Sequence, residues 1–206
     1  MSEDQASAGP TDGGRRAAIV LTSGVGVVGA ACGAFPLVST FAPSERAKAA
    51  GAPVEADISQ LKDGEMTVFE WRGKPVWVLK RTKDQLASIT KANDKVADPQ
   101  STRKPDETPE YCRNEARSRK ERPEILVAVG ICSHLGCSPS GPFAQNQNTA
   151  VLAGDQGFVC PCHGSAFDLA GRVYKNKPAP DNLEIPPYMF LSESKILIGE
   201  DKKKDA

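Results

Sequence analysis

The stretches CSHLGC at residues 132–137 and CPCHGS at residues 160–165 hold both histidines of the chain and four of its six cysteines. In the first stretch His134 lies two residues after Cys132, and in the second His163 lies three residues after Cys160. Chance would scatter two histidines over 206 residues. Their placement therefore predicts that the two stretches form one shared site.

Thiolates and imidazoles paired in this way are metal ligands. If each pair lies in a loop at the end of a strand, the four side chains can converge on one metal, and tetrahedral zinc accepts two thiolates and two imidazoles. Cys137 and Cys162 remain, one in each stretch. They exceed the four ligands of a zinc site, and in an exported protein they can oxidise to a disulfide.

A second signal lies near the N-terminus, where Arg15 and Arg16 precede a run without charged residues from Ala17 to Ser44. About 20 apolar residues cross a bilayer, whereas the apolar region of a cleavable signal has roughly 7 to 15. The run therefore predicts a retained transmembrane helix over 16–42, rich in the small residues that let membrane helices pack closely. The arginine pair predicts a cytoplasmic tail over 1–15 and also resembles a twin-arginine export signal.

Two other interpretations of this segment stay open. A lipoprotein signal could end at Cys32, but Gly29 stands where such signals favour Leu, and cleavage there would leave apolar residues without a role. Otherwise Cys32 is a small packing residue. Ordinary removal by signal peptidase is the second alternative, and the length of the run disfavours it.

The remaining residues predict a linker and one β-rich domain. Residues 43–56, PSERAKAAGAPVEA, have mixed charges and no apolar period, which is typical of a hinge linker. From residue 57 to 206 short strand patterns alternate with turn residues, which predicts an all-β fold, an antiparallel β-sandwich. EMTVFEW and PVWVLKR read as a hairpin joined by RGK, and EILVAVG and KILIGE read as further strands.

Other patterns refine this domain. Thr82 followed by Gln85 is a capping box and predicts a short helix. The charged run within 97–123 is predicted to be a solvated loop, with Cys112 as a free or structural thiol. A net charge of zero, from 26 basic and 26 acidic residues, provides no field for phosphates and argues against a nucleic-acid partner.

These features resemble the Rieske iron-sulfur proteins, and specifically the subunit of bacterial and mitochondrial ubiquinol:cytochrome c oxidoreductase. The resemblance covers the anchor, the hinge, the β-rich head with a cluster-binding subdomain over about 130–180, both Cys-His stretches and the following KPAP. It implies a 2Fe-2S cluster. The residues it assigns to one iron are Cys132 and Cys160, and those it assigns to the other are His134 and His163. It also implies a disulfide between Cys137 and Cys162, which soluble Rieske ferredoxins lack.

The resemblance implies a function as well. Ubiquinol bound at cytochrome b would give an electron and a proton, the proton passing to the catalytic His163, and the head would then move to deliver the electron to a c-type cytochrome. Leu135 would be the apolar tip that docks on cytochrome b. The implied assembly is a dimeric complex of the bacterial inner membrane with a cytoplasmic N-terminus and a periplasmic head.

The ligand set itself favours this role. Two neutral imidazoles in place of two thiolates remove negative charge, so the potential rises to about −150 to +300 mV from roughly −400 mV for plant-type clusters. In the family a Ser and a Tyr donate hydrogen bonds to cluster sulfur. This chain has Ser165 but Phe167, which predicts a lower potential than that of Tyr-containing relatives. Lys177 replaces a Gly that is usual before Pro-Ala-Pro.

Two alternatives belong to other classes. The small subunit of arsenite oxidase also has a disulfide-clamped Rieske domain and an export signal, so another exported oxidoreductase is possible. A zinc-binding module without redox function would leave Cys137 and Cys162 unexplained.

Overall fold

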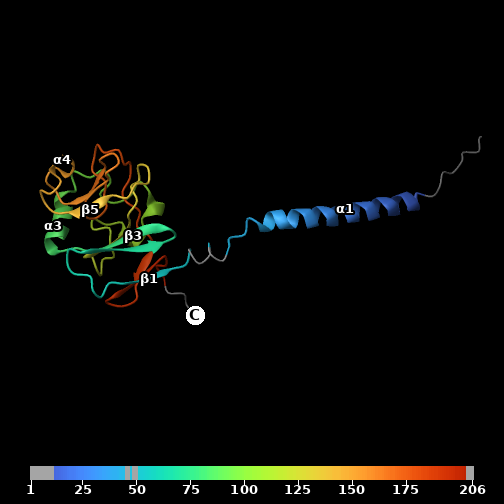
Figure 1. Ribbon diagram of the computed structural model, residues 1–206, viewed down its shortest axis with the longest axis horizontal. Coiled ribbons are helices and arrows are strands. Elements are labelled where there is room, and N and C mark those ends of the chain that lie inside the picture. The colour runs from blue at the N-terminus through green and yellow to red at the C-terminus, as the bar shows by residue number, and fades with distance from the viewer. Residues whose placement is uncertain (1–11, 45–46, 48–50, 203–206) are drawn as a thin grey trace, which may run out of the picture. The chain divides into compact units, whose positions relative to one another are not determined.

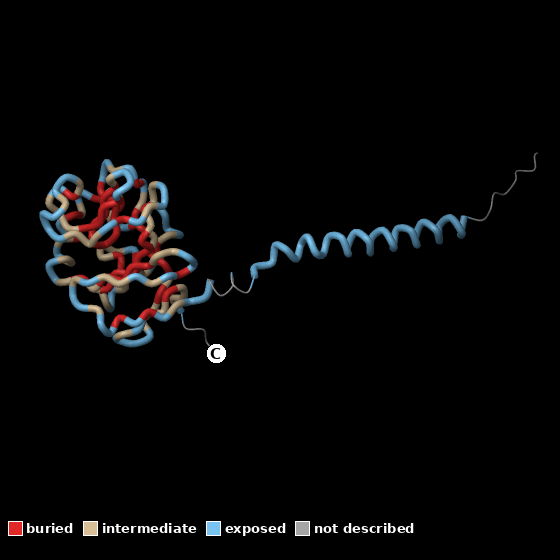
Figure 2. Tube along the Cα trace, in the orientation of Figure 1, coloured by how far each residue is buried: buried red, intermediate tan, exposed pale blue. Residues whose placement is uncertain are grey.

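The computed structural model describes residues 12–44, 47 and 51–202, and the chain separates into two compact units, 1–48 and 49–206 (Figure 1). The first unit contains helix α1, Gly13–Ser39, whose 27 residues are long and apolar enough to cross a membrane. None of its side chains is buried (Figure 2). Its apolar surface is therefore available to lipid or to other helices.

The second unit, called the head here, contains three antiparallel sheets of three strands each. Their strand orders are β1-β9-β8, β2-β3-β4 and β5-β6-β7. The strands are β1 Val54–Asp57, β2 Met66–Trp71, β3 Lys74–Lys80, β4 Ile125–Val129, β5 Ser140–Phe143, β6 Gly157–Val159, β7 Ala166–Phe167, β8 Tyr188–Phe190 and β9 Lys195–Ile198. The helical segments are α3 Lys83–Lys91, η1 Pro105–Glu107, η2 Glu110–Cys112 and α4 Thr149–Leu152. The predicted antiparallel β-rich head and N-terminal apolar helix are confirmed.

The predicted hairpin is formed by β2 and β3, which pair from Met66 opposite Leu79 to Trp71 opposite Lys74. The connecting residues Arg72 and Gly73 have φ angles of +53° and +70°. Two positive φ values are those of a type I′ turn, whose twist matches that of the flanking strands. Strand β4 pairs with the other edge of β3 and all five of its residues are buried.

Close packing at the end of β4 fixes where the first Cys-His loop begins. The Trp77 ring lies 4.8 Å from the Phe158 ring, centroid to centroid. A Cβ atom on Gly130 would lie only 2.2 Å from the Trp77 ring, so this position cannot hold a side chain without a shift of the tryptophan. Because Phe158 belongs to β6, which leads to the second loop, the contact ties both loops to the sheet framework.

Helix α3 follows the predicted capping box. The Gln85 N–H donates to Thr82 Oγ1 at 3.2 Å, and the Thr82 N–H donates to Gln85 Oε1 at 2.9 Å. Two backbone N–H groups at the start of the helix, which have no partner within it, are thereby satisfied.

The prediction of a solvated loop over 97–123 is wrong for part of that segment. It contains η1 and η2, and it buries six polar or thiol side chains: Asp98, Ser101, Thr108, Cys112, Arg117 and Ser118. Composition suggested solvent because arginine is seldom buried. The terminal nitrogens of the buried Arg117 instead donate to carbonyl oxygens from distant parts of the chain, which cannot be read from the local sequence.

Candidate metal centre

The two loops that hold the cysteines and histidines have the same backbone design. In both 132–137 and 160–165, the N–H of the first residue donates to the carbonyl of the sixth at 2.8 Å. The N–H of the fifth donates to the carbonyl of the first at 3.0 Å in both. Strand β4 leads into the first loop, while β6 and β7 flank the second. The resemblance between the two sequences is thus a structural equivalence.

The fifth residue of each loop must adopt a positive φ angle. Gly136 and Gly164 have φ angles of +82° and +70°, in the left-handed region that other residues adopt only with strain. A Cβ atom at either glycine would meet no atom within 4 Å. The backbone angle, and not a lack of space, therefore makes glycine the suitable residue.

The thiols lie inside the head and the imidazoles lie nearer its surface. Cys132 and Cys160 are free thiols, each 2% exposed, whereas His163 is exposed and His134 is half-buried. The two imidazole rings lie 4.8 Å apart between centroids, nearly perpendicular at 88°. The two histidines, one from each loop, therefore lie next to each other, and so do the two free cysteines.

The surroundings of Cys132 are those of a metal ligand. Burial raises the pKa of its thiol, and the nearby Cys160 thiol raises it too, while hydrogen bonds from the His134 N–H and the Ser165 hydroxyl lower it. Two adjacent thiolates in a dry site are unstable without a counter-charge. Bound metal supplies that charge and keeps coordinating thiols deprotonated.

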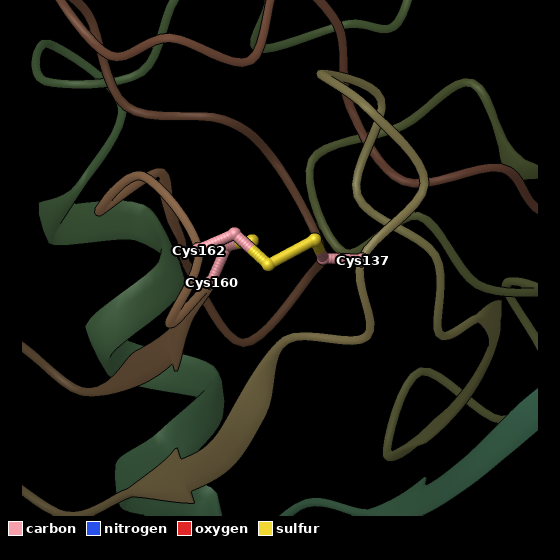
Figure 3. Close-up of side chains that lie close together, drawn as sticks. All are labelled: Cys137, Cys160 and Cys162. Carbon is pink, nitrogen blue, oxygen red and sulfur yellow. A yellow bond between two sulfur atoms is a disulfide. The ribbon is translucent and has the colours of Figure 1, made fainter.

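A disulfide joins Cys137 to Cys162, with Cα atoms 6.7 Å apart. The two sulfurs and the Cys160 sulfur lie within 4.8 Å of one another (Figure 3). Since Cys137 and Cys162 are bonded to each other, neither can act as a thiolate ligand. The bond therefore clamps one loop to the other and leaves the Cys160 thiol free for metal.

The donor set, two buried thiols and two imidazoles from two clamped loops, fits a Rieske-type cluster. Residues 107–187 match the family model described as the Rieske [2Fe-2S] domain. The chain is 50% identical over 190 residues to the ubiquinol-cytochrome c reductase iron-sulfur subunit of Allochromatium vinosum, covering 91% of this chain and 89% of that protein. It belongs to this family of Rieske iron-sulfur subunits.

Further relatives carry the same name. The subunit of Bradyrhizobium diazoefficiens is 39% identical over 181 residues, covering 87% of this chain and 90% of that protein. A solved hyperthermophilic respiratory complex III contains a chain that is 25% identical, with a TM-score of 0.44, covering 85% of this chain and 98% of that one. The Rieske subunit is thus a component of an oxidoreductase, ubiquinol-cytochrome c reductase, and carries a 2Fe-2S cluster.

The remaining predicted site residues lie around the loops of this Rieske subunit. Ser165 is fully buried, and its Oγ accepts a hydrogen bond from the Ala179 N–H at 2.9 Å. Phe167 is fully buried in β7, whereas Leu135 is 71% exposed at the first loop. Lys177 does not extend freely into solvent, since its Nζ donates to the Val151 carbonyl at 3.1 Å.

Sequence reasoning missed Ser133, which stands between two predicted ligands. Its Oγ donates to the Asp181 carbonyl at 2.6 Å and accepts from the Asp181 N–H at 3.3 Å. The first loop is thereby held against the segment that follows Pro178–Ala179–Pro180. The only sequence signal was its position beside Cys132, because its partner lies 48 residues away.

Proposed function

We propose that the chain takes an electron and a proton from ubiquinol at cytochrome b and delivers the electron to a c-type cytochrome subunit. The observation that carries the proposal is that His163 is exposed while the thiols of Cys132 and Cys160 are buried. A quinol molecule is too large to reach the buried thiols, but its hydroxyl can approach an imidazole ring at the surface.

Four side chains would hold the cluster. We assign one iron to the buried thiolates of Cys132 and Cys160, and the other to the imidazoles of His134 and His163. When bound, the cluster accepts one electron and passes it on. This assignment places the neutral ligands on the side that faces solvent and the charged ligands inside.

The proton of the quinol would be accepted by a side chain of this protein. The ring nitrogen of His163 that faces away from the metal accepts a hydrogen bond from the quinol hydroxyl and then holds its proton. With the other ring nitrogen bound to metal, this outer nitrogen could accept only after it had lost its own proton, and the positive charge of the metal would make that loss easier. Loss of electron and proton from the quinol thereby occurs at one contact.

Docking would use the exposed tip of the first loop. Leu135 is 71% exposed, and it follows directly after His134. An apolar side chain so far out of the head loses water on contact with an apolar pocket, which is favourable by about 2 kcal/mol for a fully buried leucine. We assign that pocket to cytochrome b.

The membrane arrangement belongs to the same proposal. We assign the anchor to 16–42, most of which is covered by α1, Gly13–Ser39. The positive-inside rule places Arg15 and Arg16 on the cytoplasmic side. The head would lie in the periplasm of a bacterial inner membrane. The predicted linker 43–56 overlaps β1, Val54–Asp57, which pairs with β9, so the tether would be shorter, 43–53, and the predicted head 57–206 would begin at Val54. Such a tether would let the head move between cytochrome b and the c-type cytochrome in a dimeric complex.

The test is a redox titration followed by electron paramagnetic resonance, on the membrane-bound protein at several pH values. We expect a Rieske signal whose midpoint potential falls at alkaline pH, because the outer imidazole protons are then lost from the oxidised protein. A low midpoint that does not change with pH would overturn the quinol assignment.

A matched variant separates docking from redox chemistry. Leu135→Ala should leave the midpoint and the spectrum unchanged while it lowers the rate of quinol oxidation. If the rate is unaffected, Leu135 does not dock on the quinol-binding subunit. An iron-free protein with bound zinc would restore the alternative of a non-redox module.

A further inference from the structure

Three arginine side chains are buried close to the backbone that follows the second loop. Arg81, Arg117 and Arg172 are 2%, 1% and 0% exposed. All three donate hydrogen bonds to residues within 168–171. Arginine is rarely buried unless it is paired, so these three charges require an account.

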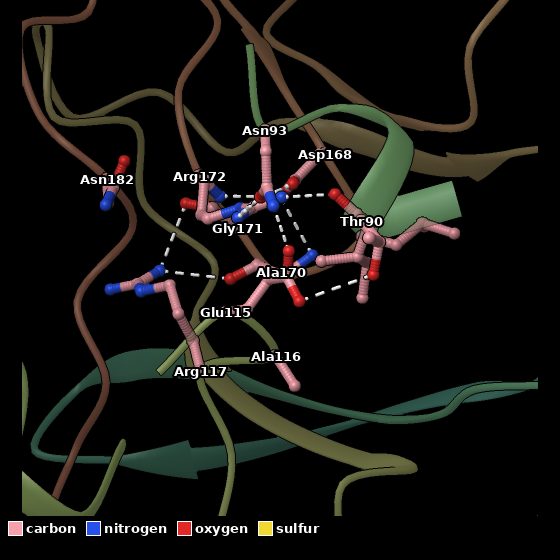
Figure 4. Close-up of polar contacts among 12 residues, drawn as sticks. Thr90, Asn93, Glu115, Ala116, Arg117, Asp168, Ala170, Gly171, Arg172 and Asn182 are labelled. Atoms are coloured by element: carbon pink, nitrogen blue, oxygen red, sulfur yellow. Dashed lines mark hydrogen bonds and ion pairs between the residues drawn. The ribbon is translucent and has the colours of Figure 1, made fainter. Parts of the chain in front are cut away.

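Among the residues that the structure describes, Arg172 is the one of the three whose guanidinium is hydrogen-bonded to a carboxylate. Arg172 Nε donates to Asp168 Oδ2 at 2.7 Å, and its other nitrogens donate to Asn93 Oδ1 and the Ile89 carbonyl, each at 2.6 Å (Figure 4). Asp168 also accepts two backbone N–H groups at Oδ1. The charge of Arg172 is thus compensated at short range.

Arg117 is compensated only at longer range, because the carboxylates of Asp168 and Asp98 attract its charge without a hydrogen bond to it. Its guanidinium donates to the carbonyls of Ala170 and Gly171, both at 3.1 Å (Figure 4). It also donates to the Leu183 carbonyl at 2.5 Å and to Thr108 Oγ1 at 3.0 Å. Within the described residues its Nε has no partner and no carboxylate is hydrogen-bonded to it. Burial lowers the pKa of Arg117 to about 10, which leaves the side chain positively charged at neutral pH.

A short path of chain and hydrogen bonds joins Arg117 to the cluster-binding loops. Its acceptor Leu183 follows Ala179 by four residues, a span of at most about 14 Å along the chain. The Ala179 N–H donates to Ser165 Oγ, and the Ser165 hydroxyl in turn donates to the Cys132 sulfur. These links place the guanidinium within roughly 25 Å of the Cys132 sulfur, inside a head where screening by salt is weak.

We propose that Arg117 raises the midpoint potential of the cluster through its buried positive charge, and that Asp168 lowers it. The reduced cluster has one more negative charge than the oxidised one, so a nearby cation stabilises reduction and a nearby anion opposes it. The inference requires that the chain hold its cluster. It does not require ubiquinol to be the electron donor, so it can fail while the proposed function stands.

The experiment measures the midpoint by paramagnetic resonance in the full membrane-bound protein with Arg117→Gln and Arg117→Lys. The glutamine substitution removes the charge and keeps two donors, whereas the lysine substitution keeps the charge. Lys120→Gln is the matched control, since it removes the same charge from an exposed side chain three residues away. Asp168→Asn keeps an oxygen for the two backbone N–H groups but loses the negative charge.

We expect the midpoint to fall in Arg117→Gln, to stay near the wild-type value in Arg117→Lys and Lys120→Gln, and to rise in Asp168→Asn. Unchanged spectral line shapes would verify that the ligands have not moved. Shifts of opposite sign that follow the sign of the removed charge are those expected of an electrostatic effect. Equal shifts in the two Arg117 variants would overturn the proposal. If Arg117→Gln does not assemble, a midpoint that falls or stays constant in Asp168→Asn overturns it, and a rise supports it.

Discussion

Removal of the disulfide should lower the free energy of unfolding of the head by an amount that depends on the number of residues between its two cysteines. Cys137 and Cys162 are 25 residues apart, and a cross-link of that span restricts the unfolded chain. The loop-entropy relation gives about 3.5 kcal/mol at 25 °C for a loop of this size. We therefore expect the variant with Cys137→Ser and Cys162→Ser together to lose about that much free energy of unfolding.

Urea unfolding followed by tryptophan fluorescence measures this loss. The chain has two tryptophans, Trp71 and Trp77, and both are buried in the head at 4% and 3% exposure. Their emission therefore reports on the head and not on the anchor. With a dependence on urea of roughly 2 kcal/mol per molar, the unfolding midpoint should fall by about 1.7 M in the double variant.

The control is Cys32→Ser, which removes a cysteine from α1 and should leave the midpoint unchanged. All samples are incubated for the same time before measurement, because loss of the cluster makes unfolding hard to reverse. A shift below about 0.5 M in the double variant would refute the reasoning. The loops would then be held by their backbone hydrogen bonds and by the cluster, with the disulfide contributing little.

Two further predictions concern single residues. Phe167→Tyr should raise the midpoint potential, because a hydroxyl that donates to cluster sulfur favours the reduced state; an unchanged midpoint would mean that Phe167 only packs. Burial raises the pKa of Cys112 from 9.0 to about 11. Between those pH values the unfolded chain loses the thiol proton while the folded chain keeps it, so stability falls as pH rises. Relative to Cys112→Ala, the wild type should lose up to about 3 kcal/mol in urea titrations at increasing pH.

The hairpin and the helix cap could be predicted because their signals are local. The residues RGK between two β-rich runs specify a tight turn, and Thr82 and Gln85 satisfy each other's backbone within one helical turn. No distant contact is needed to form either element. The same holds for α1, whose long apolar run has no buried residue in its own unit.

The charged run was misread because burial of a polar side chain depends on partners elsewhere. The terminal nitrogens of Arg117 donate to the carbonyls of Ala170, Gly171 and Leu183, which lie 53 to 66 residues away. In the sequence Arg117 is one charged residue among others, and such a run is predicted to be exposed to solvent. Only the folded chain brings together enough acceptors to offset the loss of hydration.

The sequence by itself determined the chemistry of this protein. Two Cys-His loops, one extra cysteine in each, and an apolar N-terminal run were enough to identify the family and to predict the metal ligands and the anchor, since these depend on residue type and spacing. The tertiary structure decided the orientation: thiols inside, the His163 imidazole exposed, and a buried guanidinium nearby. Exposure and electrostatic environment arise from residues far apart in the chain, so they exist only once the chain has folded.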